Sequence, residues 1–285
     1  MAMDWNDVPV FLSIAREGTL GGASRKLGQT QPTMGRRLKA LEAALGHALF
    51  QRTSDGFVLT AEGEALRVHA ERMEAEALAI GRELAAADTT HEGLLRVSCS
   101  DWFGVTLLAP VVAEFAGLQP GVVVELLTDH RLYSLPRREA DLVFRILPID
   151  DVEVVSRRLM RIDYGVYCRA GDPHPQAGDG QGASLVVMDT GFGDMPDVAW
   201  ITQRLPRARI ASRSNNREVQ AALCALGVGL AVLPRPLAER TSGLERVDLG
   251  DDPPSRDTWL GYHRDMRRLG RLRALLDLIV ARLED

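Results

Sequence analysis

The chain has 285 residues, of which 46% are hydrophobic and 26% charged, and this is enough to bury more than one core, so we expect two domains. Its net charge of −5 would argue against a polyanionic partner if the charges were spread evenly along the chain. Its three cysteines are odd in number and scattered, which suits neither a disulfide framework nor the spacing of zinc ligands. The first twenty residues carry Asp4, Asp7 and Glu17 rather than a basic flank and an apolar run, and apolar stretches such as Leu107 to Ala113 are shorter than a membrane span. We therefore expect a soluble, cytoplasmic protein with no membrane contact.

The charges are unevenly distributed along the chain. Residues 20–53 contain six cations and one acid, Glu42, which gives +5 there and leaves −10 for the remainder. The six cations are Arg25, Lys26, Arg36, Arg37, Lys39 and Arg52. This asymmetry is typical of a nucleic-acid-binding module joined to an acidic body, although a solvated basic face would give the same count.

Three helices are predicted at the N-terminus. The first has a helical period and ends at Gly18, while Pro9 limits how early it can begin. Its apolar face consists of Val8, Phe11, Leu12 and Ala15. The second spans about residues 20–27, Gly28 supplies a turn, and Thr30 is placed as the N-cap of the third, with Pro32 in its first turn. The pattern predicts helix, tight turn, helix.

The third helix has one apolar and one polar side. Its apolar stripe is Met34, Leu38, Leu41 and Leu45, and its other faces carry Gln31, Thr33, Arg36, Arg37 and Lys39. Gln and Arg side chains can make paired hydrogen bonds to base edges while further cations hold phosphates, so this side is suited to recognise double-stranded DNA. An ordinary amphipathic surface helix is the alternative.

The order and spacing of these residues resemble the signature of LysR-type transcriptional regulators. The matching positions are Phe11-x3-Ala15, Gly18-Thr19-Leu20-x2-Ala23-Ser24-x2-Leu27, Thr30-Gln31-Pro32-Thr33-x2-Arg36-x-Leu38-x2-Leu41-Glu42-x2-Leu45-Gly46-x2-Leu49-Phe50-x-Arg52 and Leu59-Thr60-x2-Gly63. The chain departs from the family at Gly21 and Gly22, where alanines are usual, and at Gly35, where serine is common. These glycines could soften the second helix and remove one phosphate contact.

The resemblance implies a winged helix-turn-helix over residues 1–60. It places Gln31, Thr33, Met34 and either Arg36 or Arg37 near the major groove, and Arg52 in a wing that touches the DNA backbone. The full set of expected DNA contacts is Arg25, Thr30, Gln31, Pro32, Thr33, Met34, Arg36, Arg37, Lys39 and Arg52.

A long helix is predicted to follow, with Thr60 as its N-cap, as part of a linker over residues 61–92. Its apolar residues recur at spacings of four and three, which is a heptad seam. The seam is Leu66, Ala70, Met73, Ala77, Ile80 and Leu84. Such a stripe can be ordinary core, but the charged flanks favour a two-stranded coil, and hence a homodimer on a palindromic site. Residues 85–92 are small and polar and are predicted to form a hinge.

From residue 93 onward the pattern changes to strands alternating with helices, which predicts an α/β body. The expected strands are 94–97, 122–127, 142–144, 166–168, 185–188 and 230–233. The run Leu226-Gly227-x-Gly229-Leu230-Ala231-x-Leu233-Pro234 resembles the LysR effector domain, which is similar to periplasmic binding proteins. That resemblance implies two Rossmann-like subdomains, one over about 93–163 and 264–285 and the other over about 164–263.

A small-molecule effector is expected in the cleft between these subdomains, because ligands of open α/β sheets bind beyond the carboxyl ends of strands. The candidate residues are Ser98, Ser100, Asp101, Trp102, Arg145, Thr190, Ser214, Asn215 and Asn216. Ser100 could instead cap the helix that begins near Trp102. Arg145 suits a carboxylate or another anionic effector, and its alternative role is a salt bridge with Asp141 or Asp150.

Enzymatic and cofactor-dependent functions find little support. No Gly-x-Ser-x-Gly elbow occurs, the histidines do not cluster with cysteines or paired acids, and no catalytic residue, metal ligand or cofactor is predicted. Cys99 lies near the proposed cleft, but a buried thiol is a simpler interpretation than a redox sensor. The alternative function is a small-molecule-binding protein or cleft enzyme whose N-terminal helices associate with another protein. The resemblance also implies a homotetramer, and RNA polymerase is a further candidate partner.

Overall fold

The computed structural model describes residues 3–54, 56–86, 92–129 and 131–284. The chain divides into two compact units, Met1–Arg82 and Glu83–Asp285, and each is described separately below. The predicted hinge falls mainly on residues 87–91, which lie outside the described residues.

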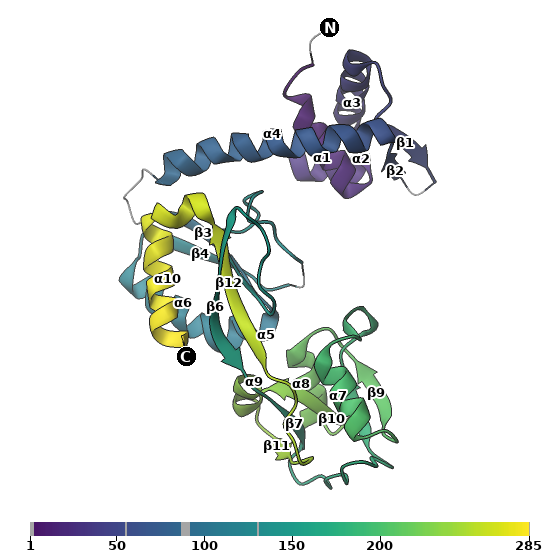
Figure 1. The fold of residues 1–285 in the computed structure, drawn as a ribbon, viewed down its shortest axis with the longest axis vertical. Coiled ribbons are helices and arrows are strands. Elements are labelled where there is room, and N and C mark those ends of the chain that lie inside the picture. Colours follow the sequence, from purple (N-terminus) through teal and green to yellow (C-terminus); the bar gives the residue numbers. More distant parts are fainter. Residues whose placement is uncertain (1–2, 55, 87–91, 130, 285) are drawn as a thin grey trace. The chain divides into compact units, whose positions relative to one another are not determined.

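The N-terminal unit contains four helices and a two-stranded hairpin (Figure 1). In chain order these are α1 (Asp7–Glu17), α2 (Leu20–Leu27), α3 (Gln31–Leu45), β1 (Phe50–Thr53), β2 (Gly56–Leu59) and α4 (Ala61–Ala86). Gly18 and Gly28 end α1 and α2 in the left-handed conformation, with φ of 65° and 62°, which glycine adopts without steric cost. Thr60 caps α4, because its Oγ1 accepts a hydrogen bond of 3.0 Å from the N–H of Gly63. The predicted helices and caps are therefore confirmed, with α1 beginning two residues before Pro9.

The core of this unit is formed by the apolar faces of α1 and α3. Phe11, Met34 and Leu41 are almost completely buried in it. Phe11 and Phe50 contact with ring centroids 5.4 Å apart, which joins the hairpin to the helices. Helical periodicity thus places one side of α3 inside the unit and leaves the other side exposed.

The C-terminal unit contains two five-stranded mixed sheets, each with its own helices, and confirms the predicted α/β body. Subdomain I has strand order β4-β3-β5-β12-β6 and carries α5, α6 and α10. Its elements are β3 (Gly93–Ser98), α5 (Asp101–Phe103), α6 (Ala109–Leu118), β4 (Val122–Leu127), β5 (Leu142–Arg145), β6 (Val154–Ile162), β12 (Arg256–His263) and α10 (Gly270–Leu283), with the π-helical turn Gly104–Leu108 between α5 and α6.

Subdomain II has strand order β11-β7-β10-β8-β9. Its elements are β7 (Tyr164–Arg169), β8 (Ser184–Val187), the 3-10 turn Thr190–Phe192, α7 (Pro196–Arg204), β9 (Arg209–Arg213), α8 (Arg217–Ala225), β10 (Leu230–Pro234), α9 (Arg235–Arg240) and β11 (Leu244–Val247). Strands β8, β9 and β10 run parallel, whereas β7 is antiparallel to β10.

The chain returns to subdomain I earlier than the sequence predicts. β12 pairs antiparallel with β6 along its whole length and with β5, so residues 256–263 belong to subdomain I rather than to subdomain II. Figure 1 shows β6 and β12 side by side. The expected return at residue 264 is therefore corrected to a point before Arg256, because two antiparallel strands, and not the last helix alone, close the sheet.

Within the described chain, the stretch Asp101–Leu118 is long and apolar enough by composition to cross a membrane. It covers α5, the π-helical turn and α6, and the side chains of Val111 and Phe115 are buried in subdomain I. Packing against the sheet accounts for the apolar composition of this stretch.

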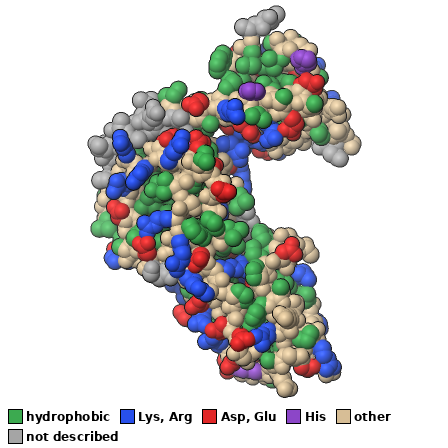
Figure 2. Space-filling model, in the orientation of Figure 1, with side chains coloured by type: hydrophobic (Ala, Val, Ile, Leu, Met, Phe, Trp, Pro, Cys, Tyr) green, Lys and Arg blue, Asp and Glu red, His purple; other side chains and the backbone are tan. Residues whose placement is uncertain are grey.

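Positive charge also gathers outside the N-terminal unit. Residues 264–273 contain five arginines against one aspartate, a local charge of +4 within a body that is negative as a whole. Figure 2 shows Lys and Arg side chains gathered on the part of the surface that α10 occupies in Figure 1.

Candidate functional site

The polar side of α3 is exposed and is positioned by a capped turn. Thr30 begins the helix, and its Oγ1 accepts a hydrogen bond of 3.4 Å from the N–H of Thr33. Thr33 itself is half-buried. The expected DNA contacts that are exposed are Arg25, Thr30, Gln31, Pro32, Arg36, Lys39 and Arg52. These side chains present hydrogen-bond donors and four long cations on α3 and its neighbours, which suits base edges and phosphates.

One expected DNA contact, Met34, is corrected by the structure, and a second, Arg37, has an intramolecular partner. Met34 has 0% of its surface exposed, so it belongs to the apolar stripe and cannot touch a base. Arg37 donates a hydrogen bond of 2.7 Å from Nε to Oδ1 of Asp7, and its side chain is 23% exposed. Of the two adjacent arginines, Arg36 is therefore the exposed one, and Arg37 fastens α3 to α1.

The wing is held against the turn between α1 and α2. The N–H of Phe57 donates a hydrogen bond of 2.7 Å to the carbonyl of Gly18. Gly56 has φ of +138°, and a Cβ there would lie 2.2 Å from that same carbonyl oxygen, so only glycine fits. Arg52 pairs with Phe57 in the hairpin and points an exposed side chain outward. The wing is thereby fixed as part of the same surface as α3.

The predicted heptad seam on α4 has a buried part and an exposed part. Ala70 is completely buried, and Leu66 and Met73 pack against the core of the N-terminal unit, so the first half of the seam is used within its own chain. Ala77 is exposed and Ile80 is 63% exposed. The side chain of Leu84 lies outside the described residues.

An apolar hollow extends this exposed half of the seam. It lies between α1 and α4, and its lining includes Trp5, Pro9, Ala77 and Ile80. Trp5 is 71% exposed and adds a large apolar side chain to this hollow.

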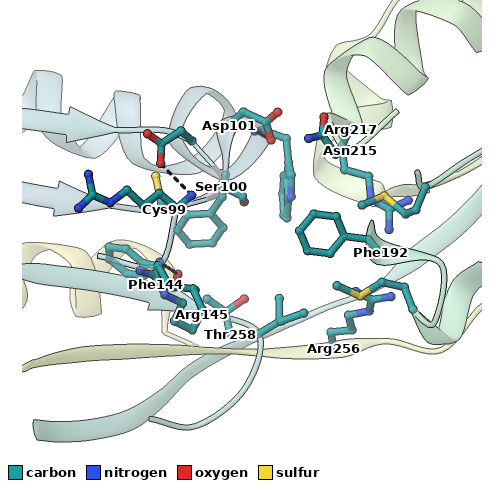
Figure 3. Close-up of a pocket in the computed structure, with 18 of the residues that line it drawn as sticks. Cys99, Ser100, Asp101, Phe144, Arg145, Phe192, Asn215, Arg217, Arg256 and Thr258 are labelled. Atoms are coloured by element: carbon teal, nitrogen blue, oxygen red, sulfur yellow. Dashed lines mark hydrogen bonds between the residues drawn. The ribbon is translucent and has the colours of Figure 1, made fainter. Parts of the chain in front are cut away.

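The C-terminal unit contains a hollow of about 190 Å³ between its two subdomains, here called the cleft (Figure 3). On the side of subdomain I it is lined by the residues that follow β3 and by Arg145 at the end of β5. On the side of subdomain II it is lined by Phe192, Asn215 and Arg217, among others. The carboxyl ends of parallel strands thus meet at the cleft, as in other open α/β sheets.

Five of the nine expected effector contacts line the cleft, and four do not. Those that line it are Ser100, Asp101, Trp102, Arg145 and Asn215, and those that do not are Ser98, Thr190, Ser214 and Asn216.

Each of the four residues outside this lining has another position or role. Ser98 is completely buried behind Arg145, and Thr190 is exposed, while Phe192 of the same turn lines the cleft instead. Ser214 Oγ accepts a hydrogen bond of 3.1 Å from the N–H of Asn216, whose own Oδ1 caps α8 by accepting one of 2.9 Å from Val219.

The structure bears on the alternative roles of Ser100, as a helix cap, and of Arg145, as the partner of an aspartate in an ion pair. Ser100 stands at the N-cap position of α5, yet its side chain makes no capping hydrogen bond. Arg145 donates from Nη1 to the carbonyl of Phe144 at 2.9 Å and from Nη1 and Nη2 to Ser98 Oγ at 3.4 Å. Among the described residues, no ion pair joins Arg145 to Asp141 or Asp150. Burial lowers the pKa of Arg145, but a guanidinium remains charged at neutral pH.

The sequence does not predict the opposite wall of the cleft. Asp197 on α7 is buried between two arginines and accepts a hydrogen bond from each. Arg217 Nη2 donates to Oδ2 at 2.7 Å, and Arg256 Nη2 donates to Oδ1. The guanidinium carbons of Arg217 and Arg256 lie 5.6 and 5.3 Å from the centre of the Tyr164 ring. We call these four residues the arginine wall. Its members come from four different elements, and no local pattern joins them.

Apolar side chains line the cleft on both sides. Trp102, Phe103 and Phe144 come from subdomain I, and Met188, Phe192 and Met195 come from subdomain II. A ligand there would be held mainly by aromatic and sulfur contacts, with the arginines fixing its orientation. In the described part of the chain, no group of three or more His, Cys, Asp or Glu side chains is placed to hold a metal ion.

The two units together define a class of protein: a winged helix-turn-helix with an exposed cationic helix, joined to a two-subdomain α/β domain that contains a ligand-sized cleft. The family model described as bacterial regulatory helix-turn-helix protein, lysR family, matches residues 5–64, and the LysR substrate binding domain matches residues 88–284. The chain therefore belongs to the LysR family of DNA-binding transcriptional regulators.

Named relatives agree with this assignment. The regulator DgdR of Burkholderia cepacia is 33% identical over 177 residues, which cover 59% of this chain and 58% of that protein, so the match spans a little over half of its length. CrgA of Neisseria meningitidis serogroup C is 25% identical over 99% of this chain and 98% of its own. The structure of full-length CbnR complexed with its target DNA has a TM-score of 0.59 and 20% identity, covering 97% of this chain and 99% of that one, which shows the shared fold.

Proposed function

We propose that this protein is a cytoplasmic regulator whose operator binding or transcriptional output is controlled by a small anionic effector, such as a carboxylate, bound in the cleft. Arg145 supports this proposal most directly. Its guanidinium lines the cleft, and among the described residues it is held by uncharged acceptors alone, so its charge is free to attract a ligand. The hydroxyl of Ser100, which makes no capping hydrogen bond to α5, lines the same cleft and can donate to the same acidic group.

The proposed DNA interface consists of Arg36, Gln31 and Lys39 on α3, with Arg52 in the wing. Base-edge contacts from Gln31 and Arg36 would supply specificity, whereas Arg52 would hold the backbone. A homodimer is supported by the exposed half of the α4 seam and by the apolar hollow beside Trp5. Two copies of α3 would then contact a palindromic site. We also propose that the protein forms a homotetramer and that RNA polymerase is a further partner.

The effector proposal is tested by screening carboxylates for thermal stabilisation of the full chain and for altered binding to the DNA upstream of its own coding region. A ligand present at 100 times its Kd stabilises the folded state by about 2.7 kcal/mol, which shifts the melting temperature measurably. Arg145→Ala should abolish the shift caused by an active carboxylate. Arg207→Ala, which removes an exposed arginine outside the cleft lining, is the control and should keep the shift. An unchanged shift in Arg145→Ala would exclude Arg145 as the anchor.

A further inference from the structure

The arginine wall carries an excess of positive charge. Arg217 and Arg256 share the single carboxylate of Asp197, and in the described chain they form ion pairs with no other acid. Their side chains are only 7% and 11% exposed, and Asp197 is 3% exposed. A buried charge without a counterion is costly, because water no longer solvates it. The wall therefore lacks one negative charge.

Neighbouring groups do not supply that charge. Tyr164 lies under both guanidiniums, but burial raises its pKa, so it stays neutral at pH 7. Asp129 is exposed and accepts hydrogen bonds from Tyr133 Oη and from the N–H of Arg131. Figure 3 shows Asp101 on the far side of the cleft from Arg256. The missing anion must come from outside the described residues.

Of the two arginines, Arg256 has donors to spare. Arg217 is held more fully by the protein, because three of its five N–H groups donate: one to Asp197, one to Gln220 Oε1 at 3.0 Å and one to the carbonyl of Val232 at 2.9 Å. Besides Asp197, the one hydrogen-bond acceptor that Arg256 has in the described part of the chain is Met195 Sδ, a weak acceptor, at 2.9 Å. Its Nε is buried and has no hydrogen-bond partner among the described residues. Arg256 is thus held in position by Asp197 and can still donate to a ligand.

We propose that Arg256, positioned by Asp197, is a second anion-binding group of the cleft, and that the effector is a small molecule with two acidic groups. This inference rests on the proposed function, in which Arg145 binds the first acidic group. Arg145 is the register partner of Trp259 in the sheet, and Arg256 lies three residues earlier on β12. Three residues of strand span about 10 Å. The aromatic side chains between the two arginines require an apolar spacer between the two acids.

Binding of radiolabelled sulfate to the full chain, measured by equilibrium dialysis, tests the two anion sites separately. We expect two sulfate ions per chain in the unsubstituted protein, one in Arg256→Gln and one in Arg145→Gln. Loss of the second ion in Arg256→Gln supports the proposal. If Arg256→Gln still binds two, or if the unsubstituted protein binds only one that Arg145→Gln removes, Arg256 is not an anion site. If Arg256→Gln loses one sulfate and Arg145→Gln loses none, Arg256 stands and the proposed role of Arg145 fails.

Paired acids of equal chain length test the ligand class. Glutarate should bind about tenfold more tightly than pentanoate, since an added charge-assisted contact is worth about 1.4 kcal/mol or more. Arg256→Gln should remove this difference. Arg256→Lys keeps the charge and the pair with Asp197, so it should fold normally and retain part of the preference, which guards against misfolding of the Gln variant. Equal affinities for glutarate and pentanoate in the unsubstituted protein would overturn the two-acid class.

Discussion

Arg37 donates a hydrogen bond of 2.7 Å to Asp7, and this contact fixes α3 against the first turn of α1. Asp7 is only 7% exposed, so the ion pair closes the inner edge of the DNA-binding unit. The next residue along the helix towards its N-terminus, Arg36, is exposed on the outer side. We therefore expect the two adjacent arginines to have separable roles, with Arg36 in DNA binding and Arg37 in stability.

Arg36→Ala should weaken binding to an operator duplex by about 1–3 kcal/mol and reduce the slope of log affinity against log salt by about one if Arg36 also contacts a phosphate. The reason is that the exposed guanidinium has no intramolecular ion pair to maintain among the described residues. Fluorescence anisotropy at several salt concentrations measures both quantities. The variant should melt at the temperature of the unsubstituted protein, and an unchanged duplex affinity would remove Arg36 from the interface.

Arg37→Ala should instead destabilise the N-terminal unit by about 1–3 kcal/mol, because it leaves a buried carboxylate without its partner. The double variant Asp7→Asn with Arg37→Ala should recover part of this loss, since the uncompensated charge is then gone. Thermal unfolding of both variants measures the coupling. If the ion pair stabilises the unit, the free energy of unfolding should fall by the same amount in Asp7→Asn and in the double variant. If the losses of the two single variants simply add in the double variant, the two side chains act independently.

The DNA-binding unit was largely predictable because its signals are local. Gly18, Gly28 and Thr30 each end or begin a helix through contacts within a few residues, and the structure shows each of these caps. Met34 is the exception, since the resemblance placed it at the groove while its own periodicity placed it in the core. Helical periodicity was the better guide there because burial is set by the face of the helix.

The effector domain was less predictable where pairing is long-range. β6 and β12 escaped prediction because both mix apolar with charged residues, as in the runs VVSRRLMRI and RDTWLGYH, and neither alternates cleanly. Each is stabilised by the other across about a hundred residues of chain. The rule for strand ends found Ser100 and Arg145, but Arg256 begins a strand and Arg217 begins a helix, so no such rule points to them.

Gly35→Ala should stabilise the protein by about 0.5–1 kcal/mol, since alanine is the better helix former. A Cβ at this position would meet only Leu20 Cδ1 at 3.6 Å, an ordinary contact. Gly63→Ala is the matched contrast, because a Cβ there would lie 2.1 Å from the carbonyl oxygen of Leu49 and must displace backbone. Thermal unfolding should therefore move in opposite directions for the two variants. A loss of stability in Gly35→Ala would show that the helix surface at this position is not free.

The Cys99 thiol should be inert at neutral pH and should make stability fall in alkali. Burial raises the pKa of Cys99 to about 12, although the nearby Arg145 charge lowers it. An unfolded thiol ionises near pH 8.5, so the unfolded state loses its proton first and the free energy of unfolding decreases as pH rises from about 8.5 towards 12. Cys99→Ala should show a shallower alkaline decrease.

Native alkylation with iodoacetamide at pH 8, followed by mass spectrometry, checks the same property directly. The modification of Cys99 should be about three orders of magnitude slower than that of an unfolded control, in proportion to its thiolate fraction. Rapid labelling in the folded protein would contradict the buried-thiol interpretation and would return redox sensing to consideration.

Ile80→Glu should dissociate the proposed dimer. Ile80 is 63% exposed in the exposed part of the α4 seam and lines the same hollow as Trp5, so a charge there would be buried against a partner's apolar surface. A hot-spot loss of about 2 kcal/mol raises the dimer Kd about 30-fold, which sedimentation equilibrium can detect. Val152→Glu is the matched control, because Val152 is 92% exposed and lies in the other unit, outside the seam. If Ile80→Glu sediments as the unsubstituted protein does, the dimer uses another surface. That other surface would then set the spacing of the two α3 helices on a palindromic site.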